Sequence, residues 1–492
     1  MASAATSTYE LYIAGREVPG SGGERRAVTD PATNAPIADV AVGTRDDARA
    51  AMEAAEKAFR ESNWATDDGA RRVKSLAKLA ALVEANAEAL ARLETLNMGK
   101  PLRESRGDLS YVVRTVEYFA GLADKVEGET IPVPGPRFDY TVREPLGVTV
   151  HLAPWNYPLL LAVRSVAPAL AAGNAVVLKP ASLTPLTAVA FARLAKEAGL
   201  PDGILNVVLG SGAEVGEALV NDPRCASVTL TGSGDVGRRI AELAARRLIP
   251  ATLELGGKGP VVVFPDADLE RAARAIGFGI FGNAGQMCWA ASRLVVHESL
   301  RAALVEKVRT IAEGLKLGPG LQDGVEMGPV VSREHEARVL GYVDDARMDG
   351  GTVVTGGTKA TGGSLDAGNF VRPTILADVP ATSRAVREEI FGPVLSVSSF
   401  SDVEDAVRLA NETPYGLLAA VWTRDLGTAH SVARRLESGM VVVNEAPVTF
   451  PQTPFGGFKA SGVGFEQGVR ALEPFTRRKN VLVHLGAPKR AK

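Results

Sequence analysis

One of the two cysteines of this chain lies in a segment whose composition suits a reactive thiol. The segment FGNAGQMCWA, residues 281–290, places glycines, an asparagine and a glutamine just before Cys288. A structural cysteine is usually buried among apolar neighbours and is inert. Small residues instead leave a thiol accessible, and amides can donate hydrogen bonds to a reacting atom. The pattern favours a nucleophilic cysteine.

A second pattern suits a phosphate group. In LTGSGDVGRRI, Gly232, Gly234 and Gly237 fit G-x-G-x-x-G between a strand-like run and a helical one. Glycines permit a tight turn, and a helix N-terminus attracts an anion, as in dinucleotide sites. By this spacing alone, Glu254 would contact a ribose of the cofactor. The alternative is an ordinary strand-to-helix turn, in which glycines are common.

Two further polar residues end strand-like runs. Glu254 precedes two glycines in LELGGKGP, where it could be a ribose ligand, a general base or the ion-pair partner of Lys258. The spacing does not decide among these roles. Asn156 lies in APWNYP, between two aromatic residues in a loop that prolines restrict. Its amide could donate to an oxyanion, or it could be a turn and cap residue.

Alternating strands and helices must position these residues. From residue 146, short β-branched runs alternate with helical segments, and the alternation resumes after Gly257 in a second unit of similar size. Such alternation implies right-handed crossovers and parallel, doubly wound sheets, which bind ligands at the carboxyl ends of their strands. The fold class is therefore α/β.

The flanking segments carry other signals. Apolar spacing over 46–98 predicts two helices. The Pro- and Gly-rich segment 128–147 predicts a hairpin or an arm outside the main core, and 480–485 predicts a late strand.

Length and composition exclude several classes of function. A chain of 492 residues is expected to form two or more domains. A net charge of -2 gives no electrostatic case for nucleic acid or a membrane surface, and no apolar run is long enough to span a bilayer. No secretory signal is visible, and two cysteines point to a reducing compartment, so we expect a cytoplasmic protein. None of the five histidines is spaced for a metal site.

The ordered motifs carry a resemblance to a known family. The segments PWNYP, LKPAS, TGSGDVG, LELGGK, FGNAGQMC, EEIFGPV and PFGGFKASGVG follow the order seen in the aldehyde dehydrogenase superfamily, and the resemblance covers essentially the whole chain. It implies two doubly wound α/β domains and a small β oligomerisation arm. The implied boundaries are 1–122 with 146–256 for the dinucleotide-binding domain, 257–460 for the catalytic domain, and 123–145 with 475–492 for the arm. The family is dimeric or tetrameric.

The resemblance also implies roles for the three polar residues described above. Cys288 matches the nucleophile, Glu254 the general base and Asn156 the oxyanion donor, and this replaces the ribose role for Glu254. The thiolate would add to a small-molecule aldehyde, the thiohemiacetal would pass a hydride to NAD(P)+, and water would hydrolyse the thioester. Coenzyme A-acylating relatives generally lack the Glu, so a free carboxylic acid is the expected product.

Residues for the dinucleotide follow from the same resemblance. The expected cofactor-binding residues are Pro154, Trp155, Lys179, Ser182, Gly212, Gly232, Ser233, Val236, Leu255, Glu389 and Phe391. NAD-restricted relatives often carry Glu where this chain has Ser182. A neutral Ser beside Lys179 favours NADP, with NAD as the alternative, although Ser182 could also be only a helix N-cap.

The substrate is less determined. Arg164 falls where the succinate semialdehyde branch has an arginine that grips a carboxylate, so an aldehyde with an anionic tail is one expectation. The second arginine of that branch is replaced by Gly282, and Trp289 is also unlike it. An aromatic, hydrophobic or amino-aldehyde is the alternative, with an aromatic wall formed by Tyr157, Phe281, Trp289, Phe450 and Phe455.

Two rival classes remain open from sequence. A thiol hydrolase could use Cys288 with His297, but no Cys–His–Asn pattern surrounds that pair and the glycine-rich turn would have no role. A non-catalytic protein on the same fold is the other rival, although such proteins tend to lose the nucleophile or the base, and both are present. Phe465 replaces the arginine of many relatives, which affects an expected subunit contact rather than the chemistry.

Overall fold

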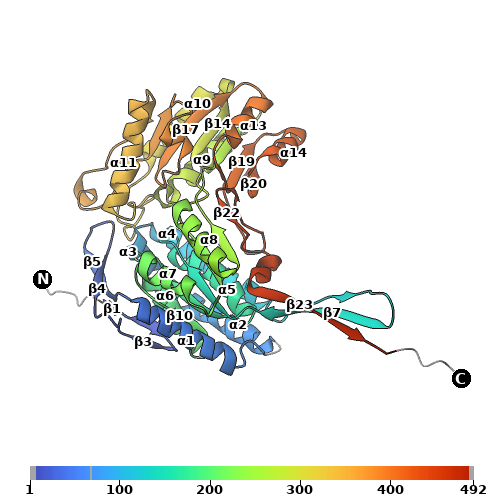
Figure 1. The fold of residues 1–492 in the computed structure, drawn as a ribbon. Helices are drawn as coiled ribbons and strands as arrows, with labels where there is room; N and C mark the ends of the chain where they lie inside the picture. The colour runs from blue at the N-terminus through green and yellow to red at the C-terminus, as the bar shows by residue number, and fades with distance from the viewer. Residues whose placement is uncertain (1–6, 67–68, 487–492) are drawn as a thin grey trace.

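Two α/β units and three small sheets make up the described part of the molecule. The computed structural model describes residues 7–66 and 69–486. Each α/β unit is built on one large sheet, with eight strands in the first unit and seven in the second (Figure 1). This confirms the α/β fold class expected from the alternation of strands and helices. Within the described ranges, no helix is both long and apolar enough to cross a bilayer.

The first unit has a parallel core with antiparallel edges. Neighbouring strands of its sheet follow the order β22 (Gly462–Val463), β12 (Ala251–Glu254), β11 (Cys225–Thr231), β8 (Val148–Leu152), β9 (Ala175–Lys179), β10 (Leu205–Val207), β2 (Leu11–Ile13) and β3 (Arg16–Val18). The five strands from β12 to β10 are parallel, and β22, β2 and β3 are antiparallel to their neighbours. The central strands are buried throughout, as a sheet covered on both faces requires.

Helices surround this first sheet. They are α1 (Arg45–Glu61), α2 (Ala70–Ala85), α3 (Ala87–Met98), α4 (Leu102–Ala120), α5 (Pro158–Ala171), α6 (Leu186–Glu197), α7 (Glu217–Asn221) and α8 (Gly234–Arg247). The expectation of two helices over 46–98 is wrong, because three helices form there. Gly69 at a left-handed φ of 94° and the non-helical Asn86 interrupt the apolar pattern.

The second unit repeats the design. Its sheet has the order β15 (Thr352–Thr355), β16 (Thr374–Ala377), β17 (Val394–Phe400), β14 (Arg293–His297), β13 (Pro260–Val263), β19 (Leu418–Trp422) and β20 (Met440–Val443), and β15 is the antiparallel edge strand. The helices of this unit are α9 (Leu269–Phe281), α10 (Arg301–Gly314), α11 (Arg333–Met348), α12 (Arg384–Arg387), α13 (Val403–Asn411) and α14 (Leu426–Arg435).

The chain returns from the second unit to the first near its C-terminus. A two-stranded ribbon of β18 (Tyr415–Gly416) and β21 (Phe458–Lys459) leads to β22, which pairs with β12 so that Gly462 lies opposite Glu254. The following residues, including Leu472 and Phe475, pack into the core of the first unit. This crossing brings the C-terminal segment beside the carboxyl end of β12.

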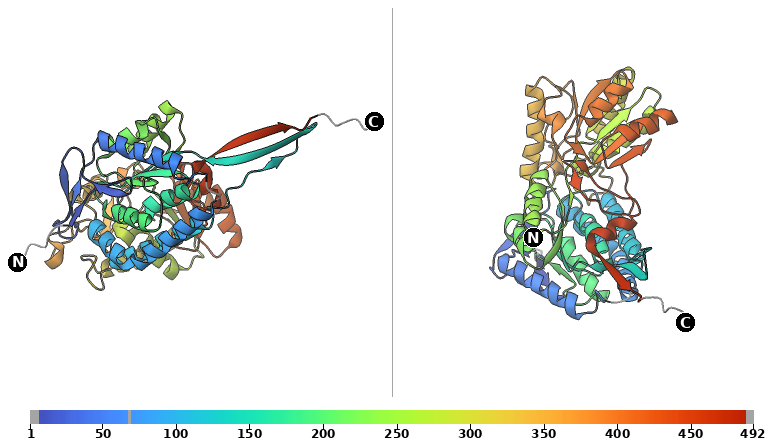
Figure 2. Two further views of the ribbon diagram at one scale, coloured as in Figure 1. Left: turned by 90° about the horizontal axis from the view of Figure 1, so that it is seen from below. Right: turned by 45° about the vertical axis from the view of Figure 1, so that its right-hand side comes forward.

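A three-stranded arm projects from the body of the molecule (Figure 2). It consists of β6 (Thr130–Ile131), β7 (Arg137–Pro145) and β23 (Thr476–His484), with β7 and β23 antiparallel over their whole length. Apolar side chains on it, including Phe138, Leu482 and Val483, are exposed. The predicted arm and late strand are both confirmed.

A second small sheet at the N-terminal side had no signal in the sequence patterns. It contains β1 (Ser7–Tyr9), β5 (Pro36–Ala41) and β4 (Arg25–Thr29), in that order. Strand β4 is exposed at four of its five residues, so it lacks the apolar run that would announce a buried strand.

Candidate active site

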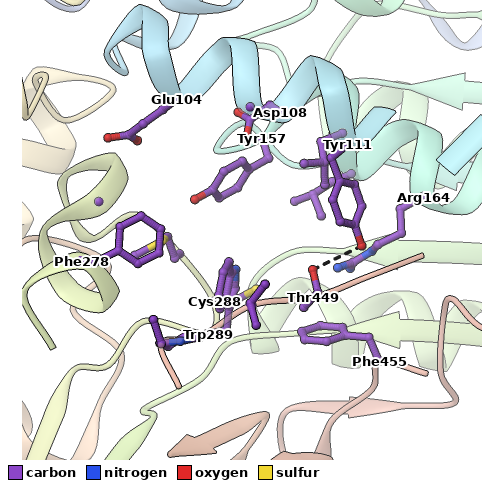
Figure 3. A pocket seen from close by; sticks show the side chains of 18 of the residues that line it. Glu104, Asp108, Tyr111, Tyr157, Arg164, Phe278, Cys288, Trp289, Thr449 and Phe455 are labelled. Atoms are coloured by element: carbon purple, nitrogen blue, oxygen red, sulfur yellow. Dashed lines mark hydrogen bonds between the residues drawn. The ribbon is translucent and has the colours of Figure 1, made fainter. Parts of the chain in front are cut away.

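Cys288 lies in the loop between α9 and β14, and it is among the residues that line a pocket (Figure 3). The loop begins with a 3-10 turn, η2 (Gly282–Gly285), in which Asn283 and Ala284 adopt left-handed φ angles of 47° and 51°. Non-glycine residues with this backbone are strained and are held by surrounding contacts, often at functional sites. The thiol of Cys288 is half-buried.

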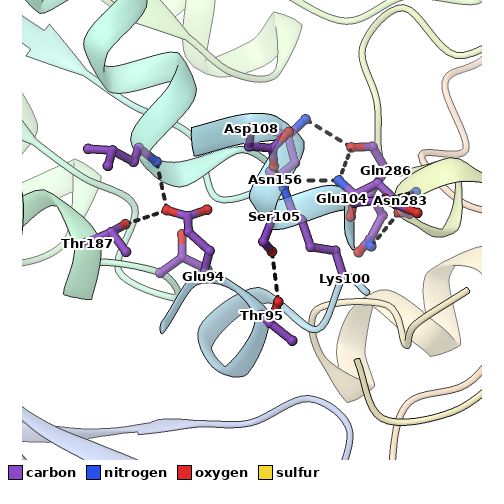
Figure 4. Close-up of polar contacts among 12 residues, drawn as sticks. Glu94, Thr95, Lys100, Glu104, Ser105, Asp108, Asn156, Thr187, Asn283 and Gln286 are labelled. Carbon is purple, nitrogen blue, oxygen red and sulfur yellow. Dashed lines mark hydrogen bonds and ion pairs between the residues drawn. The ribbon is translucent and has the colours of Figure 1, made fainter. Parts of the chain in front are cut away.

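Amide side chains hold this strained loop against the loop after β8 (Figure 4). Asn283 Nδ2 donates to the carbonyl oxygen of Asn156 at 3.0 Å, and Asn156 Nδ2 donates to the carbonyl oxygen of Gln286 at 3.0 Å. The backbone N–H of Asn283 donates to Glu104 Oε2 at 2.9 Å. The predicted oxyanion donor is therefore tied to the cysteine loop, and its second N–H remains for a ligand.

Two cavities meet at Cys288. One, of about 620 Å³, is lined mostly by apolar and aromatic side chains (Figure 3). The other, of about 200 Å³, contains Asn156 and has Gly232, Ser233 and Glu389 in its wall. Because Cys288 lines both cavities, a molecule in either one lies beside the same residue. This is the arrangement that transfer between two substrates requires.

The thiol is protonated in this state. Burial raises the pKa of Cys288 to about 12, the charges of Glu389 and Glu254 raise it further, and the cation of Arg164 opposes the shift. A thiolate is the nucleophilic form. The proton must therefore leave when the sulfur adds to a substrate, and among the neighbouring charges that of Arg164 favours its loss most.

Glu254 ends β12 and is 1% exposed. Neither of its carboxyl oxygens has a hydrogen-bond partner among the described residues. Burial raises the pKa of Glu254 well above its ordinary value, Glu466 adds to the shift, and Arg164 opposes it. A buried carboxyl with unpaired oxygens is costly to retain for stability alone, and it is a strong base when it ionises.

The smaller cavity has the features of a dinucleotide site. Helix α8 begins at Gly234 with Ser233 as its N-cap, so its positive end faces the cavity. Glu389 accepts a hydrogen bond from the Gly257 N–H at 2.9 Å, and burial raises the pKa of Glu389 to about 7. A carboxylate for ribose hydroxyls, a helix N-terminus for a pyrophosphate and aromatic walls fit a nicotinamide dinucleotide.

Gly237 has a packing role within this site. A Cβ there would come within 2.5 Å of Leu255 Cδ2, so glycine leaves room for the Leu255 side chain against α8.

The predicted cofactor-binding residues do not all line the same cavity. Pro154, Trp155, Leu255 and Phe391 line the smaller cavity together with Gly232, Ser233 and Glu389. Ser182 lines a third cavity, of about 220 Å³, which lies beside the carboxyl ends of β9 and β10. Lys179, at the end of β9, is buried beside Ser182's loop and donates to the Pro180 carbonyl at 3.0 Å. Gly212 and the exposed Val236 lie outside all three cavities.

Some of the predicted substrate residues line the large cavity and others do not. Tyr157, Arg164, Trp289 and Phe455 line the large cavity (Figure 3). Two assignments are wrong. Phe281 is 3% exposed and packs into the core of the second unit, and Phe450 is 42% exposed and lies outside the cavity wall. Phe278, one turn earlier in α9, occupies the wall in place of Phe281.

A polar face of α4 forms a part of the cavity that the sequence reasoning missed. Glu104, Asp108 and Tyr111 project from this helix into the large cavity (Figure 3). Their spacing of four and three residues, on an otherwise amphipathic helix, was the available signal. Asp108 is paired with the buried Lys100 at 2.6 Å, whereas burial raises the pKa of Glu104 to about 7.

Arg164 is not a free cation in this cavity. Its Nε donates to the carboxylate of Glu466, and the side chains are 5% and 4% exposed. The guanidinium also lies 5.0 Å from the ring of Phe455. A carboxylate at contact distance neutralises the charge that an anionic substrate tail would need.

Comparisons with known proteins agree with this geometry. The model of the Aldehyde dehydrogenase family matches residues 18–481. The chain belongs to the aldehyde dehydrogenase family. It is 42% identical over 475 residues to hydroxyisobutyraldehyde dehydrogenase of Mycolicibacterium austroafricanum, covering 96% of this chain and 94% of that one. It is also 42% identical to phenylacetaldehyde dehydrogenase of Pseudomonas fluorescens over 483 residues, with 96% of each covered.

A solved structure confirms the fold of this aldehyde dehydrogenase. The betaine aldehyde dehydrogenase of Staphylococcus aureus, solved with NAD+, superposes with a TM-score of 0.95 at 38% identity, covering 98% of this chain and 95% of that one. The family resemblance and the aldehyde dehydrogenase fold inferred from the motifs are thus confirmed.

Proposed function

We propose that this aldehyde dehydrogenase oxidises a hydrophobic or aromatic aldehyde to its carboxylic acid with NAD(P)+. The observation that carries the proposal is the position of Cys288 between an apolar cavity and a dinucleotide-like one. The wall of the large cavity supports an apolar substrate, because it is mostly apolar and includes the aromatic side chains of Tyr157, Phe278, Trp289 and Phe455.

The residues of the site divide the reaction into ordered steps. Cys288 Sγ adds to the aldehyde carbonyl as its thiol proton leaves, and the oxyanion forms beside the free N–H of Asn156 Nδ2 and the backbone N–H of Cys288. A bound nicotinamide dinucleotide supplies the hydride acceptor. Glu254, ionised, then takes a proton from the water that attacks the thioester, which releases the acid and restores the thiol. The dry environment of the carboxyl makes it basic enough for this task.

A cationic aldehyde is the second candidate. Glu104 lies in the wall of the large cavity and accepts one hydrogen bond from the described residues, and Glu445 lies in the same wall. An amino group on the substrate would restore the charge of Glu104 and lower its pKa. The name of the Staphylococcus aureus relative, betaine aldehyde dehydrogenase, supports a site of this type, since betaine aldehyde carries a quaternary ammonium group.

An anionic-tail semialdehyde is not retained. The expectation rested on Arg164, and the ion pair with Glu466 removes the free charge of Arg164.

We also propose that the first unit binds the dinucleotide and that the second unit supplies the nucleophile. The arm of β7 and β23 would join subunits into a homodimer or homotetramer, because its edge strand and its apolar side chains are exposed. A cytoplasmic location remains a proposal that rests on two unpaired cysteines.

A panel of aldehydes tests the function. The nicotinamide absorbance is followed with phenylacetaldehyde, 4-aminobutanal and succinate semialdehyde, each with NAD+ and with NADP+. We expect the highest kcat/KM for phenylacetaldehyde and the lowest for succinate semialdehyde. Cys288→Ala should abolish the signal, whereas Cys225→Ala, a change at the buried cysteine of β11, should retain it. A preference for succinate semialdehyde, or equal activity of Cys288→Ala, would refute the proposal.

A further inference from the structure

The third cavity joins the N-terminal sheet to the cofactor-binding side of the first unit. Its wall combines Arg26 of β4 with Ser182 from the loop after β9 and with Gly210 and Ser211 from the loop after β10. The Arg26 guanidinium donates a hydrogen bond to the carbonyl oxygen of Ser182. A residue from the first thirty positions of the chain therefore reaches the loop of Ser182, where relatives restricted to NAD often carry Glu.

Arg26 has no carboxylate partner there. Within the described ranges it forms no ion pair, whereas its neighbour Arg25 is paired with Glu10 at 2.8 Å and with Asp39 at 2.6 Å. Glu24 lies in the cavity wall, and its charge partly offsets the lowering of the Arg26 pKa by burial, but no bond joins the two side chains. An arginine keeps its charge at neutral pH, so an unpaired cation faces this cavity.

Lys179 adds a second positive charge nearby. Its Nζ donates to a backbone carbonyl and, among the described residues, to no carboxylate. Burial and then the repulsion from Arg26 lower the pKa of Lys179 to about 8. Two cations that repel each other and form no ion pair among the described residues favour the binding of an anion.

Ser182 contributes space rather than a donor. Its hydroxyl donates to the Gly210 carbonyl at 2.7 Å, so the hydroxyl proton is not available for a hydrogen bond to a ligand. A small neutral side chain at this place leaves room beside the ribose position, and the positive charge comes from Arg26 instead. The anion that distinguishes the two nicotinamide dinucleotides is the 2′-phosphate, which carries up to two negative charges.

We propose that Arg26 is a specificity-determining residue that recognises the 2′-phosphate of NADP and gives this enzyme a preference for NADP over NAD. The inference rests on the proposed function only in taking the bound ligand to be a nicotinamide dinucleotide. Arg26 would form charge-assisted hydrogen bonds to the phosphate oxygens, with Lys179 adding its charge. Glu214 and Glu24 in the same wall would oppose the phosphate, so the cation of Arg26 is needed to tip the balance.

Calorimetric titration of the full-length protein tests the inference without any aldehyde. The probes are 2′,5′-ADP against 5′-AMP, and NADP+ against NAD+. The wild type should bind the phosphorylated member of each pair more tightly. Arg26→Gln should weaken 2′,5′-ADP and NADP+ by about 10- to 100-fold, the worth of a charge-assisted hydrogen bond, and leave 5′-AMP and NAD+ unchanged. Arg26→Lys should restore part of the loss.

Two control variants separate recognition from local folding. Arg25→Gln changes the adjacent, ion-paired arginine and should alter no affinity. Glu24→Gln should tighten NADP+. A loss of equal size for both members of each pair in Arg26→Gln would assign Arg26 to loop folding and overturn the inference, as would tighter binding of 5′-AMP by the wild type. Dinucleotide binding without aldehyde oxidation would overturn the proposed function and leave this inference standing.

Discussion

Arg164, which lines the large cavity, forms a buried ion pair with Glu466, although 302 positions separate the two residues in the chain. The arginine comes from α5 and the glutamate from the segment after β22, which the chain brings back to the first unit. One terminal guanidinium nitrogen of Arg164 and one carboxylate oxygen of Glu466 have no partner within the described ranges. The pair therefore sets the charge of the cavity, and Arg164 also lowers the pKa of Glu254 and of Cys288.

Freeing Arg164 should change the substrate preference. In Glu466→Gln the guanidinium loses its counter-charge and can accept an anionic tail. We expect the ratio of kcat/KM for succinate semialdehyde to that for phenylacetaldehyde to rise about 10-fold or more, as one charged hydrogen bond allows. The variant should also lose about 3–5 kcal/mol of unfolding free energy, since one member of a buried pair remains. An unchanged ratio in a folded variant would show that Arg164 does not face the substrate.

The reactivity of Cys288 should depend steeply on pH in the absence of ligands. Its pKa of about 12 lies far above neutral, so the thiolate fraction rises about tenfold for each pH unit. Alkylation by iodoacetamide in a Cys225→Ala background should therefore accelerate about tenfold per unit between pH 7 and 9. A rate that levels off near pH 8 would show that the resting enzyme already holds a thiolate.

Asn156 should act on the rate rather than on the fold. Asn156→Asp keeps the size of the side chain but replaces the N–H donors with an acceptor. We expect kcat to fall by about 10²- to 10³-fold, the cost of removing one oxyanion donor. Circular dichroism melts should show whether the loss of the bond to the Gln286 carbonyl also destabilises the loop. A variant with nearly full kcat would exclude Asn156 as the oxyanion donor.

The exposed arm should determine the oligomeric state. Leu482→Lys together with Val483→Lys places charge on an apolar surface that is 56% and 40% exposed in the single chain. Light scattering after gel filtration should show a smaller assembly than the wild type. Leu248→Lys, at the exposed end of α8, is the matched control and should leave the assembly unchanged. Retention of the wild-type mass in the double variant would place the interface elsewhere.

Local patterns predicted the α/β fold, because each strand and helix depends on a short segment, and the family motifs supplied the candidate reacting groups. Glu254 ends β12, Asn156 follows β8 and Cys288 precedes β14, and the arm has its own Pro- and Gly-rich signature. The side of a helix on which a given apolar residue lies was harder to predict. Phe281 and Phe278 are both apolar residues of α9, and only the packed structure shows which one faces the core.

Partners from distant segments could not be read from the sequence at all. Glu466 lies far from Arg164 in the sequence but neutralises its charge in the folded chain. Arg26 reaches Ser182 from an exposed strand that has no apolar pattern. Both contacts change what a site residue does without changing the motif in which it lies. In our proposals the substrate and cofactor preferences depend on such contacts, which the motifs do not contain.

We propose that Cys288 forms a covalent thioester and that Glu254 activates the water that hydrolyses it. The most direct test of this proposal is the intact mass of Glu254→Gln after mixing with phenylacetaldehyde and NAD(P)+. We predict one equivalent of reduced dinucleotide and a protein mass increased by the acyl group, with peptide mapping locating it on Cys288, and no adduct in the variant that also carries Cys288→Ala. Steady turnover by Glu254→Gln without an adduct, or an adduct on another residue, would contradict the account.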